Sequence, residues 1–154
     1  MPTLSVRFQA QIPSGLVLAK EGPKVPVELR IPKELEGLLQ QENKPIPAPL
    51  TGLGLIDTGA SATMIDQDAV SLLCVSPVGL VNLITPAGPS QSPLYPVRLA
   101  IVVPGNPPLI AASLASAAAG PLKAQGLLCL IGRDILQRAI LVYNGTDGSV
   151  SIAF

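Results

Sequence analysis

The sequence is poor in the residues on which several large classes of function depend. Histidine and tryptophan are absent, aromatic residues make up 3% of the 154 positions, and charged residues make up 13%. Ten basic residues balance ten acidic ones, so no net charge is available to attract a nucleic acid backbone. Cys74 and Cys129 fit no metal-ligand spacing. We therefore expect no nucleic-acid partner, no metal and no cofactor.

Long apolar runs are also missing, although apolar residues make up 48% of the chain. The run from Leu109 to Leu122 ends at Lys123, which is short of the roughly 20 residues that a membrane span requires. The sequence begins Met1-Pro2-Thr3 and shows no basic and apolar secretion signal. These patterns predict one domain over 1–154, no membrane partner and a cytoplasmic location. Both cysteines lie in apolar stretches and are predicted to be buried free thiols.

The apolar pattern predicts a mostly β protein with one or two short helices. Residues alternate between apolar and polar over 4–8 and 25–31, which is typical of strands. Leucines at helical spacing over 32–42 predict a surface helix, and prolines then predict an extended connector. We interpret the range of about 32–49 as an insertion. The alanine-rich range 109–126 fits either a helix or a strand.

Two further local signals predict a helix cap and a hairpin. Asp66 is placed to cap a short helix that runs to Leu73, and capping explains Asp66 and Asp68 better than metal binding does. Strand-like residues on both sides of 144–148, Asn-Gly-Thr-Asp-Gly, predict a hairpin near the C-terminal end.

One stretch of the sequence places an acidic residue where burial of its charge is expected to cost free energy. The apolar run Leu53-Gly54-Leu55-Ile56 leads directly into Asp57, so the carboxyl group emerges from a predicted buried strand into a tight loop. Burying a lone carboxylate is unfavourable by several kcal/mol unless the group is paired or protonated. Asp57 is therefore the leading candidate for a functional residue.

The residues around Asp57 resemble a known catalytic signature. Asp57-Thr58-Gly59 resembles the active-site motif of the aspartic proteases, and 130–136, Leu-Ile-Gly-Arg-Asp-Ile-Leu, resembles the second motif of their retroviral-type branch. The chain thus resembles a single-lobe, retropepsin-like aspartic protease of cellular or bacterial type. The resemblance implies a closed β-barrel with one or two short helices. It also implies a flap hairpin at about 81–103, with substrate-binding residues Ile84, Thr85, Pro86, Ala87 and Gly88.

The single copy of the Asp-Thr-Gly motif predicts the assembly. Hydrolysis by this route needs two carboxyl groups, one as base toward water and one as acid toward the substrate carbonyl. One chain supplies one such acid, so we predict a homodimer in which Asp57 of two subunits activates the water. The predicted activity is that of an aspartic endopeptidase acting on an extended peptide or protein. The strands near 2–8 and 149–154 are candidates for the interdigitated sheet that such dimers use.

The resemblance assigns supporting roles to the neighbours of Asp57. Thr58 is expected to bond to the loop of the other subunit, and Gly59 to allow close approach of backbone and substrate. Ala60 has no hydroxyl group to donate to the carboxylate, and this absence predicts a mildly acidic activity optimum. Ile131 and Gly132 are expected to pack beside and beneath the loop.

The second motif departs from the family at one position. In viral relatives the arginine that corresponds to Arg133 pairs with an acid, but the matching position here is Ser61. Two outcomes stay open. Arg133 either bonds backbone carbonyls and the Ser61 hydroxyl, or it finds another acid such as Asp134 or one from the partner chain.

Two other interpretations stay open. A peptide-binding or scaffold module could keep the retropepsin-like fold without proteolysis, as the Ser61 departure and the insertion suggest. Alternatively, Asp57-Thr58-Gly59 could be a strand-to-turn sequence in which the aspartate bonds its own backbone. Loss of cleavage in an Asp57 variant separates both from an enzyme.

Overall fold

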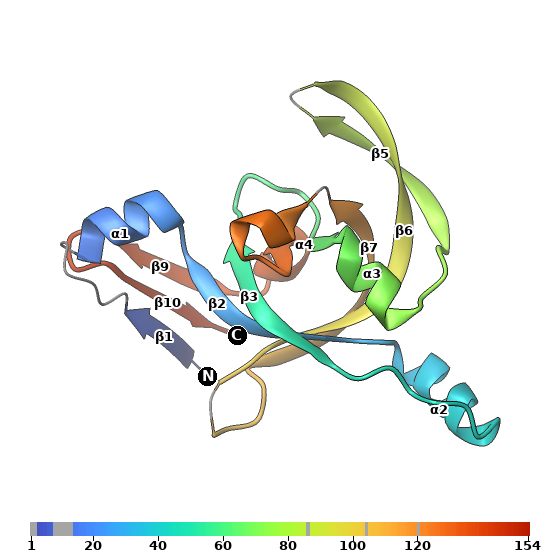
Figure 1. Ribbon diagram of the computed structural model, residues 1–154. Coiled ribbons are helices and arrows are strands. Elements are labelled where there is room, and N and C mark those ends of the chain that lie inside the picture. Colours follow the sequence, from blue (N-terminus) through green and yellow to red (C-terminus); the bar gives the residue numbers. More distant parts are fainter. Residues whose placement is uncertain (1–2, 8–13, 86, 104, 120) are drawn as a thin grey trace.

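The structure is a computed structural model that describes residues 3–7, 14–85, 87–103, 105–119 and 121–154. It is mostly β, as predicted, with the strands divided between two sheets (Figure 1). The strands are β1 (Thr3–Arg7), β2 (Lys24–Arg30), β3 (Leu50–Ile56), β4 (Met64–Asp66), β5 (Gly79–Thr85), β6 (Gly88–Ile101), β7 (Ile110–Ala119), β8 (Cys129–Ile131), β9 (Ile140–Asn144) and β10 (Ser149–Ala153). The helices are α1 (Ser14–Glu21), α2 (Lys33–Gln41), α3 (Gln67–Leu73), the 3-10 helix η1 (Leu122–Gln125) and α4 (Arg133–Leu136).

The parallel pair β3 and β8 brings the two sequence motifs together. Ile56 lies opposite Ile131, and the next residue along β3, Asp57, donates its backbone N–H to the Ile131 carbonyl at 3.0 Å. Because parallel strands end at the same edge of a sheet, the Asp57 loop and α4 leave the core side by side. β4 pairs antiparallel with the other side of β8.

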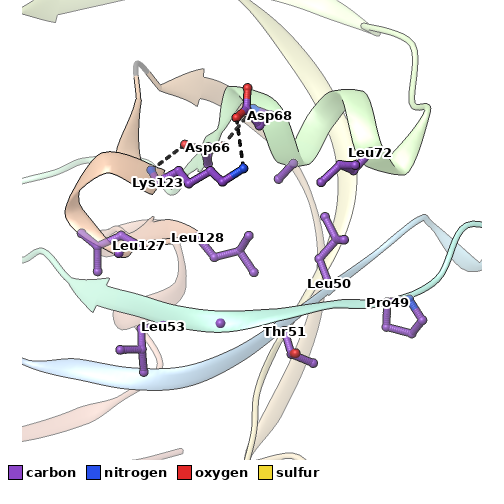
Figure 2. A pocket seen from close by; sticks show the side chains of 13 residues that line it. Pro49, Leu50, Thr51, Leu53, Asp66, Asp68, Leu72, Lys123, Leu127 and Leu128 are labelled. Atoms are coloured by element: carbon purple, nitrogen blue, oxygen red, sulfur yellow. Dashed lines mark hydrogen bonds and ion pairs between the residues drawn. The ribbon is translucent and has the colours of Figure 1, made fainter.

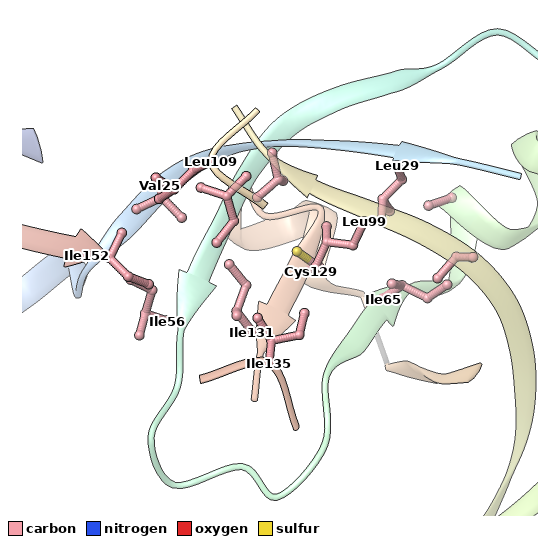
Figure 3. Packing of buried hydrophobic residues seen from close by; sticks show 14 of the residues in the cluster. Val25, Leu29, Ile56, Ile65, Leu99, Leu109, Cys129, Ile131, Ile135 and Ile152 are labelled. Atoms are coloured by element: carbon pink, nitrogen blue, oxygen red, sulfur yellow. The ribbon is translucent and has the colours of Figure 1, made fainter. Parts of the chain in front are cut away.

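The core lies between these central strands and the strands around them (Figure 3). Val25, Val27 and Leu29 of β2 alternate with more exposed residues and are fully buried, which matches the predicted strand. Gly54 makes the centre close-packed, because a Cβ there would lie 2.9 Å from both Cys129 Sγ and Val27 Cγ1. The chain therefore passes between its neighbours at a point where only glycine fits.

A hairpin is present in the range predicted for the flap, about 81–103. β5 and β6 are antiparallel, and their ladder runs from Gly79 opposite Leu94 to Thr85 opposite Gly88. Strand β6 begins at Gly88, which has a φ of +111°, so the tip of the hairpin is short. Pro86 lies outside the described residues.

The single closed barrel implied by the resemblance is not confirmed, because the strands form two sheets. The larger sheet has the order β2-β3-β8-β4-β7-β6-β5, and it curls so that the end of β6 also pairs with β2. The smaller sheet has the order β1-β10-β9. In it β1 pairs antiparallel with β10, with Thr3 opposite Ala153, so the terminal strands pair with each other within one chain.

Some of the helices were predicted from the sequence and others were not. α2 and α3 lie where the sequence predicted them, and Asp66 caps α3 by accepting the Asp68 N–H at 2.9 Å. α1 was not predicted, and the alanine-rich range forms β7 followed by η1. Cys74 was wrongly expected to be buried: it is exposed, in a left-handed conformation at the end of α3. Among the described residues, no helix combines the length and apolar character needed to cross a membrane.

Candidate active site

The Asp57 carboxyl group is half-buried and held at the end of β3 by its own loop. Its Oδ1 accepts the backbone N–H groups of Gly59 at 2.9 Å and Ala60 at 3.2 Å. A Cβ at Gly59 would lie 3.1 Å from Oδ1, so glycine leaves room for this carboxylate. Within the described part of the chain, Asp57 Oδ2 and the Thr58 hydroxyl receive no hydrogen-bond partner. The loop thus fixes one carboxylate oxygen and leaves the other available.

Arg133 supports this loop from α4. Its Nη1 donates to the carbonyl oxygens of Thr58 at 2.7 Å and Gly59 at 2.9 Å. The expectation that Arg133 bonds backbone carbonyls is therefore confirmed, whereas neither the Ser61 hydroxyl nor Asp134 is its partner in the described chain. A guanidinium group with two carbonyl acceptors fixes the path of the loop without an acid at position 61.

Asp134 has a different partner, Thr63, which is buried. The Thr63 hydroxyl donates to Asp134 Oδ1 at 2.7 Å, and the Thr63 backbone N–H donates to the same carboxylate at 2.9 Å. The hydroxyl oxygen of Thr63 also accepts the Gly132 N–H at 3.0 Å. Ser116, which is fully buried on β7, donates to the Thr63 carbonyl at 2.6 Å. The buried Thr63 therefore ties the strand after the loop to α4 through Gly132 and Asp134 and to β7 through Ser116.

Gly132 packs tightly beneath the loop, as expected. A Cβ on Gly132 would collide with the Ala62 backbone and would lie 2.6 Å from its carbonyl oxygen. The backbone of Gly132 is extended, with a φ of −89°, so close packing and not conformation requires glycine here. Ile131 is fully buried directly before it. Two more backbone bonds join the segments, from Arg133 to Ala60 at 3.0 Å and from Asp134 to Ser61 at 3.2 Å.

A cleft of about 370 Å³ begins beside the Asp57 loop and extends under the hairpin. The loop side of the cleft contributes 59–62 and Met64, and the hairpin side contributes 81–84 and Leu94. Ile84 is 95% exposed although it belongs to this lining. Of the predicted flap residues, Ile84 is thus the one that lines the cleft among the described residues, and Ala87 and Gly88 lie at the far end of the hairpin.

A second cavity, of about 410 Å³, lies between the start of β3, α3 and η1, as Figure 2 shows. Leucines form much of its wall, and Asp66 and Asp68 lie at its polar end. Asp66 accepts the backbone N–H of Lys123 at 2.8 Å in addition to capping α3, and Asp68 pairs with Lys123 Nζ at 3.6 Å. The predicted capping role of Asp66 is confirmed.

Sequence reasoning missed Thr63 and Ser116. Thr63 lies in a short polar and apolar stretch before β4, and nothing in its neighbours marks it as buried. Ser116 lies among alanines that fit a helix as well as a strand. The one available signal for Thr63 is its position, four residues after Gly59 and directly before β4. Its partner Asp134 was assigned to the site on the second motif alone.

Among the residues that the structure describes, no three acidic or cysteine side chains gather where they would hold a metal ion. The chain matches no model of a known protein family and no curated protein.

Proposed function

We propose that the chain is an aspartic endopeptidase that hydrolyses peptide bonds as a retropepsin-like homodimer. The observation that carries the proposal is the state of Asp57: a carboxyl group fixed through one oxygen, with the other oxygen uncommitted, on a loop whose residues 59–62 line a cleft under a hairpin. The clamp of Arg133 on the loop adds support, because catalysis requires that such a group be held in one position.

In the proposed mechanism two copies of Asp57 meet across a two-fold axis. Like charges a few Å apart do not both ionise readily, so one carboxyl group stays protonated while the other is charged. The charged group takes a proton from water, which attacks the peptide carbonyl, and the protonated group gives its proton to the carbonyl oxygen, which forms a tetrahedral diol. The C–N bond then breaks as the amine nitrogen takes the proton from the first carboxyl group, and a diol hydroxyl returns a proton to the second, so the dyad again holds one proton. The Thr58 hydroxyl, without a partner in the described single chain, is available to bond to the second loop.

The proposed substrate is an extended peptide with apolar side chains. The cleft beside the loop is lined mainly by aliphatic and small residues, with Asn82 as a polar contribution from β5. An extended chain under a hairpin can add to the sheet, so that alternate side chains enter the cleft. A cytoplasmic location stays a prediction.

The test is cleavage of a peptide library between about pH 4 and 7, with wild-type protein and Asp57→Asn at equal dimer content. Asp68→Asn is the matched control, because Asp68 is a largely exposed acid outside the site. We expect the wild type and Asp68→Asn to cleave and Asp57→Asn to lose activity. Equal cleavage by Asp57→Asn and the wild type would refute the aspartic mechanism.

A second candidate is a peptide-binding module without proteolysis. The observation that favours it is the pair of bonds from Gly59 and Ala60 to Asp57 Oδ1, because they satisfy part of the carboxylate within its own loop. This module would bind extended peptides in the cleft, and the Asp57→Asn change would leave their affinity nearly unchanged. Peptide binding without cleavage by the dimeric wild type would establish this function instead.

A further inference from the structure

The first half of β3 has one edge without a strand beside it. β3 pairs with β2 along 50–55, but its pairing with β8 covers only 54–56. The last contact on the β8 side is the bond from the Leu128 N–H to the Leu53 carbonyl at 2.7 Å. In the described part of the chain, no strand continues this edge toward Leu50.

The backbone of Thr51 faces that open edge. In an antiparallel pair, successive residues turn their N–H and C=O groups alternately toward and away from the partner strand. Ile56 donates its N–H to the Pro23 carbonyl, so the even-numbered residues of β3 bond toward β2 and the odd-numbered ones bond away from it. Both backbone groups of Thr51 therefore point to the open side, where no described residue pairs with them. A free N–H and a free C=O on one edge residue are the groups that an added strand requires.

The cavity of about 410 Å³ between β3, α3 and η1 lies against this edge (Figure 2). Thr51 belongs to its lining, together with Leu50 and Leu128. Gly52 leaves the β3 wall of the cavity bare, because a Cβ there would already lie 3.2 Å from Leu128 Cβ. A cavity of this volume is in the range that proteins use to bind ligands, and its wall offers both apolar contacts and a strand edge.

Leu72 extends the apolar surface beyond this cavity. Its side chain is 60% exposed, and it lines both this cavity and a neighbouring one of about 440 Å³. Leucines of α2 and α3 and the segment 45–47 form most of the neighbouring cavity. The two cavities share Leu72 as a wall and follow the chain along 45–47 and 49–53, and we call them together the β3 groove. An extended polypeptide segment suits a groove of this form, because it can present its backbone and its side chains along the same line.

The charges at the polar end of the β3 groove favour a basic group. Asp66 and Asp68 outnumber Lys123, the one basic residue in the described lining of the cavity beside β3. The oxygens of Asp66 accept the backbone N–H groups of Asp68 and Lys123, and the Asp68 carboxylate lies 3.6 Å from Lys123 Nζ. Asp68 is 58% exposed, so it can also reach a partner. An excess of negative charge attracts a lysine or an arginine.

We propose that the β3 groove binds an extended segment of a partner protein that carries a large apolar residue beside a basic one. The backbone of the segment pairs with Thr51, its apolar side chain packs among the leucines of the groove, and its basic side chain reaches Asp68. The groove is separate from the cleft beside the Asp57 loop, because the described linings of the two share no residue. The proposal therefore does not depend on proteolysis.

The first test measures peptide binding in a background of Asp57→Asn and Ile84→Lys, which suppresses cleavage and binding at the cleft. The probes are acetylated and amidated hexapeptides with a central leucine next to lysine, alanine or glutamate, and calorimetry gives their dissociation constants. We expect lysine peptides to bind at least about fivefold more tightly than glutamate peptides. The proposal is overturned if no lysine peptide binds, or if glutamate peptides bind as tightly.

A matched pair of leucines tests where the peptides bind. Leu72→Gln should raise the dissociation constant of the lysine peptides at least about fivefold, because an apolar contact is lost. Leu16 is 62% exposed on α1, outside the β3 groove, so Leu16→Gln should stay within about twofold of the background protein. An unchanged constant in Leu72→Gln overturns the proposal.

Pairing with the edge of β3 has a readout of its own. An added strand turns only alternate N–H groups toward one edge, so methylation of the peptide nitrogen that faces Thr51 should abolish binding. Methylation of the next nitrogen along the peptide should leave binding nearly unchanged. Equal effects at successive nitrogens would show that the peptide does not bind as a strand, and would overturn the proposal.

A second copy of the chain is the other occupant that the tests must separate. Sedimentation of the wild type and of Leu72→Gln compares their self-association. A dimer that Leu72→Gln dissociates would assign the β3 groove to a second copy and overturn the proposal. Equal self-association of the two proteins, together with peptide binding that depends on Leu72, supports a partner protein. Peptide cleavage by the wild type without any binding in the groove refutes the groove and leaves the proposed function standing.

Discussion

The hydroxyl group of Thr63 donates to Asp134 Oδ1 at 2.7 Å and accepts the N–H of Gly132 at 3.0 Å. One buried side chain therefore joins the strand that leaves the Asp57 loop to the motif that follows β8. The backbone N–H of Thr63 donates to the same carboxylate, so the carboxylate of Asp134 loses more than one partner if the strand shifts.

Replacing Thr63 with valine should destabilise the fold. The change keeps the shape of the side chain but leaves the Gly132 N–H without its acceptor and removes one bond to a charged group. We expect a loss of about 2 to 3 kcal/mol in the free energy of unfolding, measured with urea. Thr63→Ser retains the hydroxyl group and should lose about 1 kcal/mol. Equal losses in the two variants would contradict the importance of the hydroxyl group.

Two glycines offer a matched comparison of packing. Gly132→Ala places a methyl group against the Ala62 backbone, and we expect a loss of about 1 to 3 kcal/mol in unfolding free energy. Gly37→Ala, in the middle of α2, meets nothing within 4 Å and should raise the free energy by about 0.5 to 1 kcal/mol. Thermal unfolding of both variants measures whether each change lowers or raises the free energy of unfolding. A stabilised Gly132→Ala protein would contradict the close contact.

Cys129 should make stability depend on pH in alkaline solution. Burial raises the pKa of the Cys129 thiol from 9.0 to about 12. Its contribution is fully present below pH 9 and is lost as the pH rises toward 12, because only the unfolded state releases the proton in that range. We expect this thiol to remove about 1 kcal/mol of unfolding free energy between pH 8 and 10. Cys129→Ala should show a smaller loss over the same range.

Thiol labelling provides the control for that measurement. At pH 8 the exposed Cys74 should react rapidly in the folded protein, and Cys129 should react only on unfolding. A Cys74→Ser chain should therefore show almost no labelling until it is unfolded. Rapid labelling of that variant in its folded state would contradict the buried position of Cys129.

Ile84 should affect substrate binding without affecting the fold. It is 95% exposed in the cleft lining, so Ile84→Lys should change the free energy of unfolding by less than about 0.5 kcal/mol. For an apolar peptide we expect KM to rise about tenfold with little change in kcat. The apolar contact is lost equally in the bound substrate and in the transition state. Leu16→Lys, an exposed leucine on α1, is the control and should leave KM unchanged.

Local chemistry accounts for the predictions that were confirmed. Asp66 caps α3 because its carboxylate accepts the Asp68 N–H, and such a bond depends on residues close in sequence. The hairpin of β9 and β10 likewise depends on Asn144, whose Oδ1 accepts the N–H groups of Thr146 and Asp147. The strands and α2 followed from the spacing of apolar residues.

Long-range pairing accounts for the predictions that were wrong or missing. Alanines in β7 favour a helix by propensity, yet eight residues of β6 pair with this segment in register from Leu94 to Ile101. The pairing of β1 with β10 within one chain was not predicted, because nothing local shows that β1 lies beside a strand at the other end of the sequence. The roles of Thr63 and Ser116 were not predicted for the same reason, because their hydrogen-bond partners lie 71 and 53 positions away in the sequence.

The pairing of Thr3 with Ala153 also bears on the order in which the chain folds. Closing a loop costs conformational entropy that grows with the number of residues enclosed, and this pair encloses nearly the whole chain. The β9 and β10 hairpin closes over a few residues and can form early. We expect β1 to dock last, onto a hairpin that is already in place. Destabilising substitutions in β1 should then raise the unfolding rate of the chain more than they lower its folding rate.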